Sequence, residues 1–170
     1  MQNDLFSESY QKDAILSKCR TFRYSLSRTW NQGLPKAVFI GLNPSTADEH
    51  EDDPTIRRCI GFAKSWECGG LIMINLFAFR STDPKLLLTA DDPVGPENNH
   101  HIKHALKAGS ILVAAWGNHG KLLQRHIEVM NFAQGRLSAL SITKSGMPGH
   151  PLYIAKTAKL IPYQNSQDKT

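Results

Sequence analysis

Four short apolar runs recur along the chain, at residues 37–41, 71–75, 111–115 and 137–142, and helix-like segments separate them. A run of this length bounded by glycine or polar residues is typical of a strand buried on both faces of a parallel sheet. Strands that alternate with helices predict an α/β fold, because each crossover helix packs on a face of the sheet. We therefore expect three layers: a central four-stranded, mainly parallel sheet with helices on both faces.

The N-terminal part of the chain has a different pattern. Residues 22–27 alternate apolar and polar side chains (Phe-Arg-Tyr-Ser-Leu-Ser), which is the period of a half-buried strand. That strand could add an antiparallel edge to the sheet, and residues 1–18 are expected to be a polar lead-in with some helical character. Asp52-Asp53-Pro54 predicts a helix start, because aspartate caps free amides and proline fits the first turn. Further helices are expected over residues 97–107, 121–133 and 151–160.

The length of 170 residues fits one domain with its own core. We assign residues 1–163 to that domain and expect residues 164–170 to form a disordered tail. No apolar run approaches the roughly 20 residues needed to span a bilayer, and the start of the chain is polar rather than a signal peptide. A cytoplasmic protein with no membrane partner is therefore expected; the pattern indicates no particular oligomeric state.

Cysteine content and charge add two constraints. Cys19, Cys59 and Cys68 form no C-x-x-C pair, and an odd number without metal-ligand spacing is typical of reduced thiols. We expect each to be a small buried hydrophobic residue. The formal net charge of +5 permits a phosphate-bearing partner, such as DNA or a nucleotide.

Polar segments follow the apolar runs where each strand would end. In open α/β sheets ligands bind just beyond the carboxyl ends of the strands, so these segments predict a site. Asn43 follows the first strand, and Pro44 forces it into an extended conformation. Its carboxamide can orient a water or a ligand edge. A simple Asn-Pro turn is the alternative, but small neighbours such as Gly41 and Ser45 let a ligand approach the backbone.

Acidic residues crowd the same loop. Asp48 is the closest of them to the strand end, and we take it as the candidate general base. The other acids are expected to be solvated caps near the following helix. Arg57, at the start of that helix, could pair with these acids or contact phosphate.

The second strand ends at Asn75, whose carboxamide matches the donor and acceptor pattern of a nucleobase edge. Phe77 could stack on a base, or it could belong to the core. Trp116-Gly117 ends the third strand, and the tryptophan is expected to be a core residue. His150 lies between Gly149 and Pro151, where it could donate a hydrogen bond to a developing negative charge; a structural histidine of the turn is the alternative.

Two further groups of residues have side chains that suit phosphate or metal. Lys144, in the loop before His150, could pair with phosphate. His100 and His104 would share one face of a helix, as metal-binding pairs do, but no third ligand stands at a fitting spacing. We therefore expect no metal and no cofactor.

The order of these motifs resembles the uracil-DNA glycosylase superfamily. Gly41-Leu42-Asn43-Pro44 is similar to the first motif of its mismatch-specific branch, and Ile72-Met73-Ile74-Asn75 resembles the strand whose asparagine reads uracil. Ala115-Trp116-Gly117-Asn118 and Gly149-His150-Pro151-Leu152 resemble two further segments of that superfamily. Asn43 stands where uracil-specific members carry the aspartate that activates water. No cysteine set for an iron–sulfur cluster is present.

A closer resemblance covers nearly the whole chain. Residues 41–48 (GLNPSTAD) and 146–153 (GMPGHPLY) look like a bacterial and phage family known only as a domain of unknown function, which brings no established activity. Together the two resemblances imply a nucleobase-recognising protein with a glycosylase-like fold, which could hydrolyse the base–sugar bond of uracil or a modified base in DNA or a nucleotide. The alternatives are a nucleotide-binding or nucleic-acid-binding module without turnover, and an interaction domain that acts on a DNA enzyme.

The glycosylase-like activity implied by the resemblance assigns roles to particular residues. Asn43 would position water, Asp48 would act as a base and His150 would stabilise the departing base. The expected base-binding residues are Gly41, Leu42, Pro44, Asn75 and Phe77. The expected phosphate or nucleic-acid contacts are Ser45, Thr46, Arg57, Lys144, Ser145, Leu152 and Tyr153, with Leu152 or Tyr153 as a wedge that enters a duplex while the base is extruded.

Overall fold

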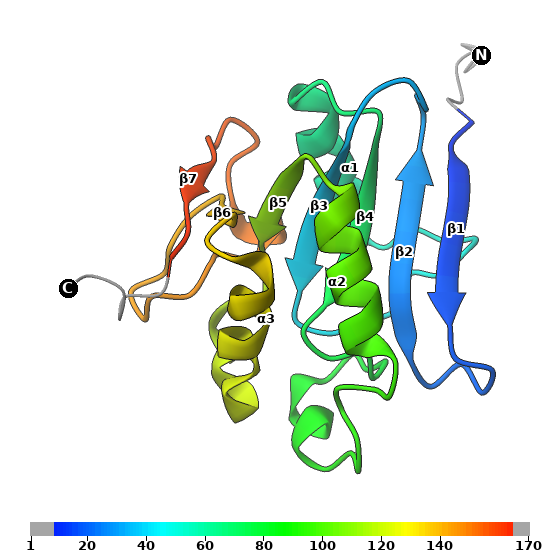
Figure 1. Cartoon of the computed structure of the whole chain (residues 1–170), viewed down its shortest axis with the longest axis vertical. Coiled ribbons are helices and arrows are strands. Elements are labelled where there is room, and N and C mark those ends of the chain that lie inside the picture. Colours follow the sequence, from blue (N-terminus) through cyan, green and yellow to red (C-terminus); the bar gives the residue numbers. More distant parts are fainter. Residues whose placement is uncertain (1–8, 165–170) are drawn as a thin grey trace, which may run out of the picture.

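The computed structural model describes residues 9–164, and a seven-stranded mixed sheet with the order β1-β2-β4-β3-β5-β6-β7 forms its centre (Figure 1). The predicted parallel core of four strands is confirmed, because β3 pairs in parallel with β4 and β5, and β5 with β6. The tail expected to be disordered lies outside the described residues except for Gln164. The strands are β1 (Gln11–Leu16), β2 (Arg23–Thr29), β3 (Lys36–Gly41), β4 (Gly70–Asn75), β5 (Ile111–Ala114), β6 (Ser138–Ala139) and β7 (Ile161–Pro162).

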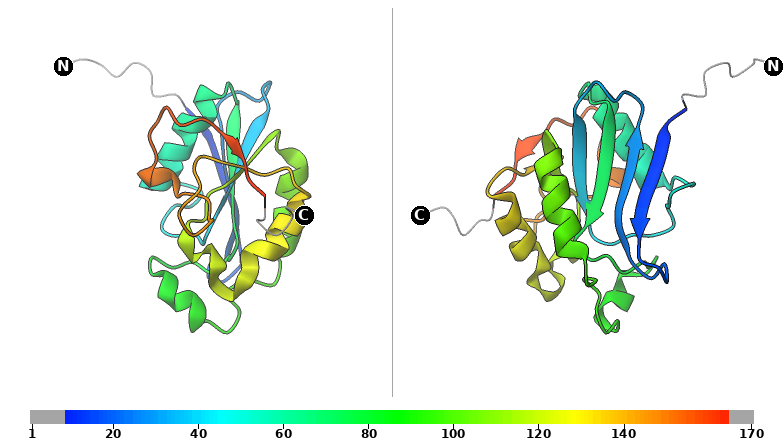
Figure 2. Two further views of the ribbon diagram at one scale, coloured as in Figure 1. Left: turned by 90° about the vertical axis from the view of Figure 1, so that its left-hand side faces the viewer. Right: turned by 45° about the vertical axis from the view of Figure 1, so that its right-hand side comes forward.

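Three α-helices cover the two faces of the sheet, as the alternating pattern predicts. They are α1 (Pro54–Ser65), α2 (Asn98–Ala108) and α3 (Arg125–Ala133), with short 3-10 helices η1 (Pro84–Leu88), η2 (Asn118–Gln124) and η3 (Pro151–Tyr153). The apolar residues of α1 pack with Phe39, Met73 and Val113 on one face. Those of α2 and α3 pack with Val38 and Ile74 on the other. The left view in Figure 2 shows this three-layer arrangement edge-on.

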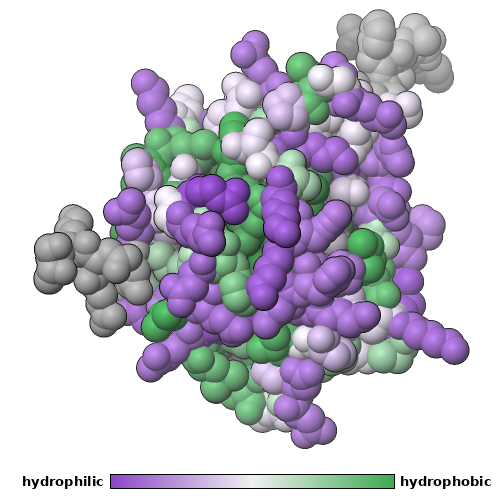
Figure 3. Space-filling view, in the orientation of Figure 1, coloured by the Kyte–Doolittle hydropathy of each residue, from purple (hydrophilic) through white to green (hydrophobic). Residues whose placement is uncertain are grey.

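The outward side of α2 and α3 is mostly hydrophilic in the space-filling view, with apolar atoms visible between charged side chains (Figure 3). On α2, Ile102, Ala105 and Leu106 are buried while Lys103 and Lys107 are exposed. The helix therefore has one apolar stripe against the sheet and one solvated side. No helix within residues 9–164 is long and apolar enough to cross a membrane.

Several sequence-based boundaries were wrong, each for a local reason. Residues 11–16 form an edge strand and not a helix. The first three positions of this strand are exposed, so it has no apolar pattern that would indicate a strand. Residues 151–160 form only the short η3, which ends at Tyr153. Helix α3 begins at Arg125 because Leu123 and Gln124 have left-handed backbone angles (φ 51° for both). The strand predicted over 137–142 is a regular strand only at Ser138–Ala139, and Ile142 forms an isolated antiparallel bridge with Pro148.

An irregularity in β2 changes the face of the sheet on which the side chains of its first residues lie. Ile15 pairs with Ser25, but the next residue of β1, Leu16, pairs with Arg23, so Tyr24 is an extra residue. Such a bulge redirects side chains and is frequent beside functional sites. Tyr24 stacks on His101 of α2, whereas the Arg23 side chain reaches the loop after β3 on the other face. The simple alternation read from residues 22–27 therefore fails at the start of this strand.

Candidate functional site

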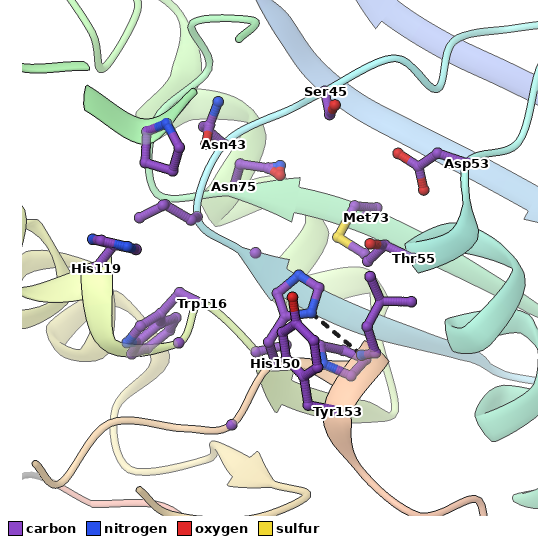
Figure 4. A pocket seen from close by; sticks show the side chains of 18 of the residues that line it. Asn43, Ser45, Asp53, Thr55, Met73, Asn75, Trp116, His119, His150 and Tyr153 are labelled. Carbon is purple, nitrogen blue, oxygen red and sulfur yellow. Dashed lines mark hydrogen bonds between the residues drawn. The ribbon is translucent and has the colours of Figure 1, made fainter. Parts of the chain in front are cut away.

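A pocket of about 690 Å³ opens at the carboxyl ends of β3, β4 and β5, on the face covered by α1 (Figure 4). This volume lies within the range of pockets that bind small molecules. Its lining comes from the start of β2, the loop after β3, the N-terminus of α1, the end of β4 with the segment after it, the segment after β5, the chain after β6 and the turn around η3. The prediction of a site at the strand ends rests on the same topology, because parallel strands end at one edge.

Asn75 is a buried polar residue that faces the pocket, with 3% of its surface exposed. Its backbone carbonyl accepts a hydrogen bond from Asn98 Nδ2, but its carboxamide has no hydrogen-bond partner among residues 9–164. Gly41 is its neighbour on β3. A Cβ at Gly41 would lie 3.3 Å from Asn75 Oδ1, so the missing side chain of Gly41 leaves the room that the amide occupies. A buried amide without a partner is costly, and the pocket is where a partner can reach it.

Asn43 lies beside Asn75 in the same pocket (Figure 4). Its Nδ2 donates to Ser81 O at 2.9 Å and, over longer distances, to Phe79 O and Pro44 O. These bonds tie the loop after β3 to the segment after β4. The Oδ1 atom makes no hydrogen bond within the described chain, so Asn43 can offer the pocket an acceptor but no donor.

His150 reaches the pocket from the opposite side, on the turn that starts η3 (Figure 4). Its Nδ1 accepts a hydrogen bond from the Leu152 amide at 3.3 Å, which assigns the proton of a neutral ring to Nε2. Burial lowers the pKa of the His150 imidazole, and the charge of Asp53 opposes this shift. A neutral imidazole that donates from Nε2 is therefore the form the site holds.

Two contacts fix the turn that carries His150. Arg58 of α1 donates to the carbonyls of Pro151 and Ile154. Gly149 lies so close to Ser141 that a Cβ would stand 2.1 Å from the Ser141 hydroxyl, so only glycine fits there without a shift. The position of the imidazole is thus set by the helix on one side and by the chain after β6 on the other.

Arg23 is a pocket residue that the sequence reading missed, because the bulge in β2 hides its orientation. Its side chain is buried, with 3% of the residue exposed. Nη1 donates to Ala47 O at 2.8 Å, Nε is buried with no partner, and no carboxylate within residues 9–164 forms an ion pair with it. Burial lowers the pKa of the guanidinium to about 10, so it stays charged at neutral pH.

The acid at the pocket is Asp53 and not Asp48. Asp48 Oδ1 accepts the backbone amides of His50 and Glu51 at 2.8 and 2.9 Å, and these bonds lower the pKa of its carboxyl group. Asp48 therefore shapes the loop. Asp53 caps α1 by accepting the Ile56 amide at 2.8 Å through Oδ1, and its second oxygen is left for the pocket.

The other predicted site residues divide into two groups. Gly41, Leu42, Ser45, Leu152 and Tyr153 line the pocket, the last with 86% of its surface exposed. Phe77 does not, because its ring is fully buried in the core against α2 and has no face free for a base. The remaining predicted contacts also lie outside the pocket: Pro44, Thr46, Arg57, Lys144 and Ser145.

Local bonds explain two of these placements. Arg57 donates to Asp52 O at 2.9 Å, and Ser145 donates to Asn118 Oδ1 at 2.7 Å. Trp116, expected in the core, is 1% exposed and also forms one wall of the pocket. Gly117 follows with φ 69°, a left-handed conformation that lets the chain turn sharply out of β5.

No cysteine is among the described residues that line this pocket. Within residues 9–164 no group of three or more His, Cys, Asp or Glu side chains is placed to hold a metal ion. Cys59 and Cys68 are buried, as expected, but Cys19 is exposed. Because Cys19 is exposed, its expected role as a buried hydrophobic residue was wrong. Hydrogen bonds with Ser17 and Thr21 lower the pKa of the Cys19 thiol to about 7.

Comparisons with known proteins bear on the identity of the chain. Neither a search of curated proteins nor a search of solved structures gives a match. A family model described as protein of unknown function (DUF1643) matches residues 23–152. This match covers most of the chain, including strands β2 to β6 and the pocket-lining residues up to Leu152. The chain therefore belongs to the DUF1643 family.

Proposed function

We propose that the pocket recognises a nucleobase, with Asn75 reading the polar edge of the base. The observation that carries the proposal is the Asn75 carboxamide, which is 3% exposed, without a partner in the described chain, and directed into the pocket. A base edge presents neighbouring donors and acceptors, and a carboxamide can pair with both at once. Gly41, its neighbour on β3, leaves the room that this carboxamide occupies.

The groups around Asn75 support a planar ligand with polar edges. Asn43 Oδ1 supplies a second acceptor, and His150 supplies a donor from the opposite side of the pocket. Met73 and Leu42 provide apolar contact area between these polar groups. Pockets that combine apolar walls with a few fixed polar groups are typical of small-molecule sites.

The finer part of the proposal is hydrolysis of the base–sugar bond. The four strand-end motifs resemble those of the uracil-DNA glycosylase superfamily, and that resemblance supports this reaction. A water oxygen would form a bond to the anomeric carbon as the bond to the base nitrogen breaks, and the base would leave with the electron pair. The water proton would pass to Asp53, and the Nε2–H of His150 would stabilise the negative charge on the base.

The experiment measures binding and base release separately. Calorimetry with the five common nucleosides tests recognition, and oligonucleotides that contain uracil, hypoxanthine or 5-hydroxymethyluracil test release of the base. Asn75→Asp keeps the shape of the side chain but removes its donor, and we expect at least a tenfold loss of affinity, about 1.4 kcal/mol. Asn131→Asp, on the exposed side of α3, is the matched control and should change nothing.

The outcomes separate the alternatives. Binding without release of any base would reject hydrolysis and retain recognition, as expected of a binding module. Release that is lost in His150→Gln and in Asp53→Asn would support the reaction. If no nucleoside binds and no base is released, the proposal is rejected, and an interaction domain that acts on a DNA enzyme is the alternative that remains.

A further inference from the structure

We infer that the Arg23 end of the pocket holds a terminal phosphate, so that the ligand class is a nucleoside monophosphate rather than a base within a nucleic-acid strand. This inference rests on the proposed function, because the base is assigned to the Asn75 end. Arg23 begins β2, and the pairing of Leu26 with Met73 places it beside the end of β4, where Asn75 lies. The two groups therefore stand on neighbouring strands of one pocket.

The Arg23 guanidinium has hydrogen-bond donors that no protein acceptor uses. Of its three nitrogens, Nη1 has one protein acceptor, Nε is buried without one, and Nη2 makes no hydrogen bond within residues 9–164. The buried Arg28 on the same strand is different, since it forms an ion pair with Asp52 at 2.7 Å. Burial of a cation is costly unless an anion compensates it. A planar guanidinium with free donors is suited to two oxygens of a phosphate.

The surrounding charges leave that cation uncompensated. The groups that act electrostatically on Arg23 are Asp53, Arg80, Arg28 and Asp48. Asp53 has the largest effect of the four, but neither it nor Asp48 forms an ion pair with Arg23 within residues 9–164. Asp53 is engaged as the cap of α1, and an incoming phosphate would have to approach on the guanidinium side of that carboxylate.

Neutral donors complete this end of the pocket. The hydroxyl groups of Ser45 and Thr55 line it, and neither has a hydrogen-bond partner in the described chain. Thr55 lies in the first turn of the 12-residue helix α1, whose N-terminus favours negative charge. Figure 4 shows Ser45, Thr55 and Asp53 together at one side of the pocket, away from His119 and Trp116.

The depth of Arg23 distinguishes a terminal phosphate from an internal one. When a base is extruded from a strand, the base enters the pocket while the phosphates on both sides of it belong to a chain that continues outside. Arg23 is only 3% exposed, so a phosphate that reaches it has little room for a continuing chain. Phosphodiesters would instead meet the surface hollow that Arg80, Ser81 and Thr82 line.

Calorimetry with the wild-type protein tests the inference without any variant. The probes are 2′-deoxyuridine, thymidine and the deoxynucleosides of adenine, cytosine and guanine, each with its 5′-monophosphate, together with ribose 5-phosphate and a single-stranded oligonucleotide that contains the preferred base internally. We expect the monophosphate to bind at least tenfold more tightly than its nucleoside. The oligonucleotide should bind no better than the nucleoside.

Variants then test whether Arg23 is the residue that makes the monophosphate bind more tightly than its nucleoside. Arg23→Gln should remove the preference for the monophosphate and leave nucleoside affinity within about twofold, whereas Arg23→Lys should keep part of the preference because it keeps the charge. Lys107→Gln, on the exposed side of α2, is the matched control and should leave both affinities unchanged. Thermal unfolding of each variant shows that the comparison is made on folded protein.

Failure of the inference and failure of the proposed function give different results. Equal affinity for nucleoside and monophosphate rejects the phosphate site and leaves base recognition intact. Binding of ribose 5-phosphate that Arg23→Gln abolishes, with no binding of any nucleoside, supports the phosphate site and rejects base recognition. An oligonucleotide that binds as tightly as the monophosphate, and is weakened by Arg80→Gln, rejects the terminal phosphate in favour of a strand.

Discussion

Replacement of Arg28 by methionine should destabilise the protein strongly, because this side chain holds the loop that leads from β3 to α1. Arg28 has no exposed surface and forms an ion pair with Asp52 at 2.7 Å. Its guanidinium also donates to four backbone carbonyls, those of Asp13, Ser27, Asp48 and Glu51. The loop it holds supplies Ser45 and Asp53 to the pocket.

The expected loss of unfolding free energy is about 3–5 kcal/mol, the usual cost of removing one partner from a buried ion pair. Summing the hydrogen bonds one by one would exceed this figure, because several share one guanidinium and their contributions are not additive. Asp52 is 14% exposed at its side chain, so water can solvate part of the carboxylate that loses its partner, which favours the lower end of the range. Urea unfolding followed by circular dichroism measures the change at constant m-value.

Arg57→Ala is the matched control on the helix that follows. Arg57 is exposed and makes a single hydrogen bond, to Asp52 O, so its removal should change stability by less than about 0.5 kcal/mol. If Arg28→Met cost less than about 1 kcal/mol, the loop would be held by other contacts, and the reasoning from burial and pairing would be wrong.

Three further predictions follow from the site and its surroundings. Gly41→Ala should lower nucleoside affinity several-fold in calorimetry with little change in stability, because the new Cβ would crowd Asn75 Oδ1 at 3.3 Å; unchanged affinity would contradict the assigned fit. Iodoacetamide at pH 7.5 should label Cys19, whose thiol pKa is about 7, before Cys59, whose pKa burial raises; mass spectrometry that finds Cys59 labelled first would refute this order. Burial lowers the pKa of His150, so the unfolded chain takes up a proton before the folded protein does as the pH falls below about 6.5. Urea unfolding between pH 7.5 and 5 should therefore show a loss of stability that is smaller in His150→Gln than in the wild type. An equal loss in both proteins would exclude the histidine as its source.

The parallel core could be read from the sequence because its strands are continuous apolar runs. Residues 37–41 and 71–75 have no polar side chain before their ends, and only a strand covered on both faces fits that composition. The start of α1 was equally readable, since Asp53 caps the helix and Pro54 occupies its first turn. Edge strand β1 carries no such signal, because exposed positions dominate it.

The sequence predicted the site residues that follow the strand ends, but not those whose orientation depends on irregular backbone. Asn43, Asn75 and His150 meet in one pocket because three consecutive connections return to the same sheet edge. Arg23 could not be placed, because the bulge at Tyr24 breaks the alternation that assigned it to the polar side. Asp48 was chosen over Asp53 by distance along the chain, but turn hydrogen bonds direct its carboxylate to the backbone.

The most direct test of base recognition follows the side-chain amide protons of Asn75 by ¹H–¹⁵N correlation NMR during titration with a nucleoside. The resonance pair is identified by its absence in Asn75→Asp. If the carboxamide pairs with a base edge, this pair shifts and saturates with the dissociation constant found by calorimetry, while the amide of Asn131 stays unchanged. A nucleoside that binds and leaves the Asn75 amide protons unmoved would contradict the account.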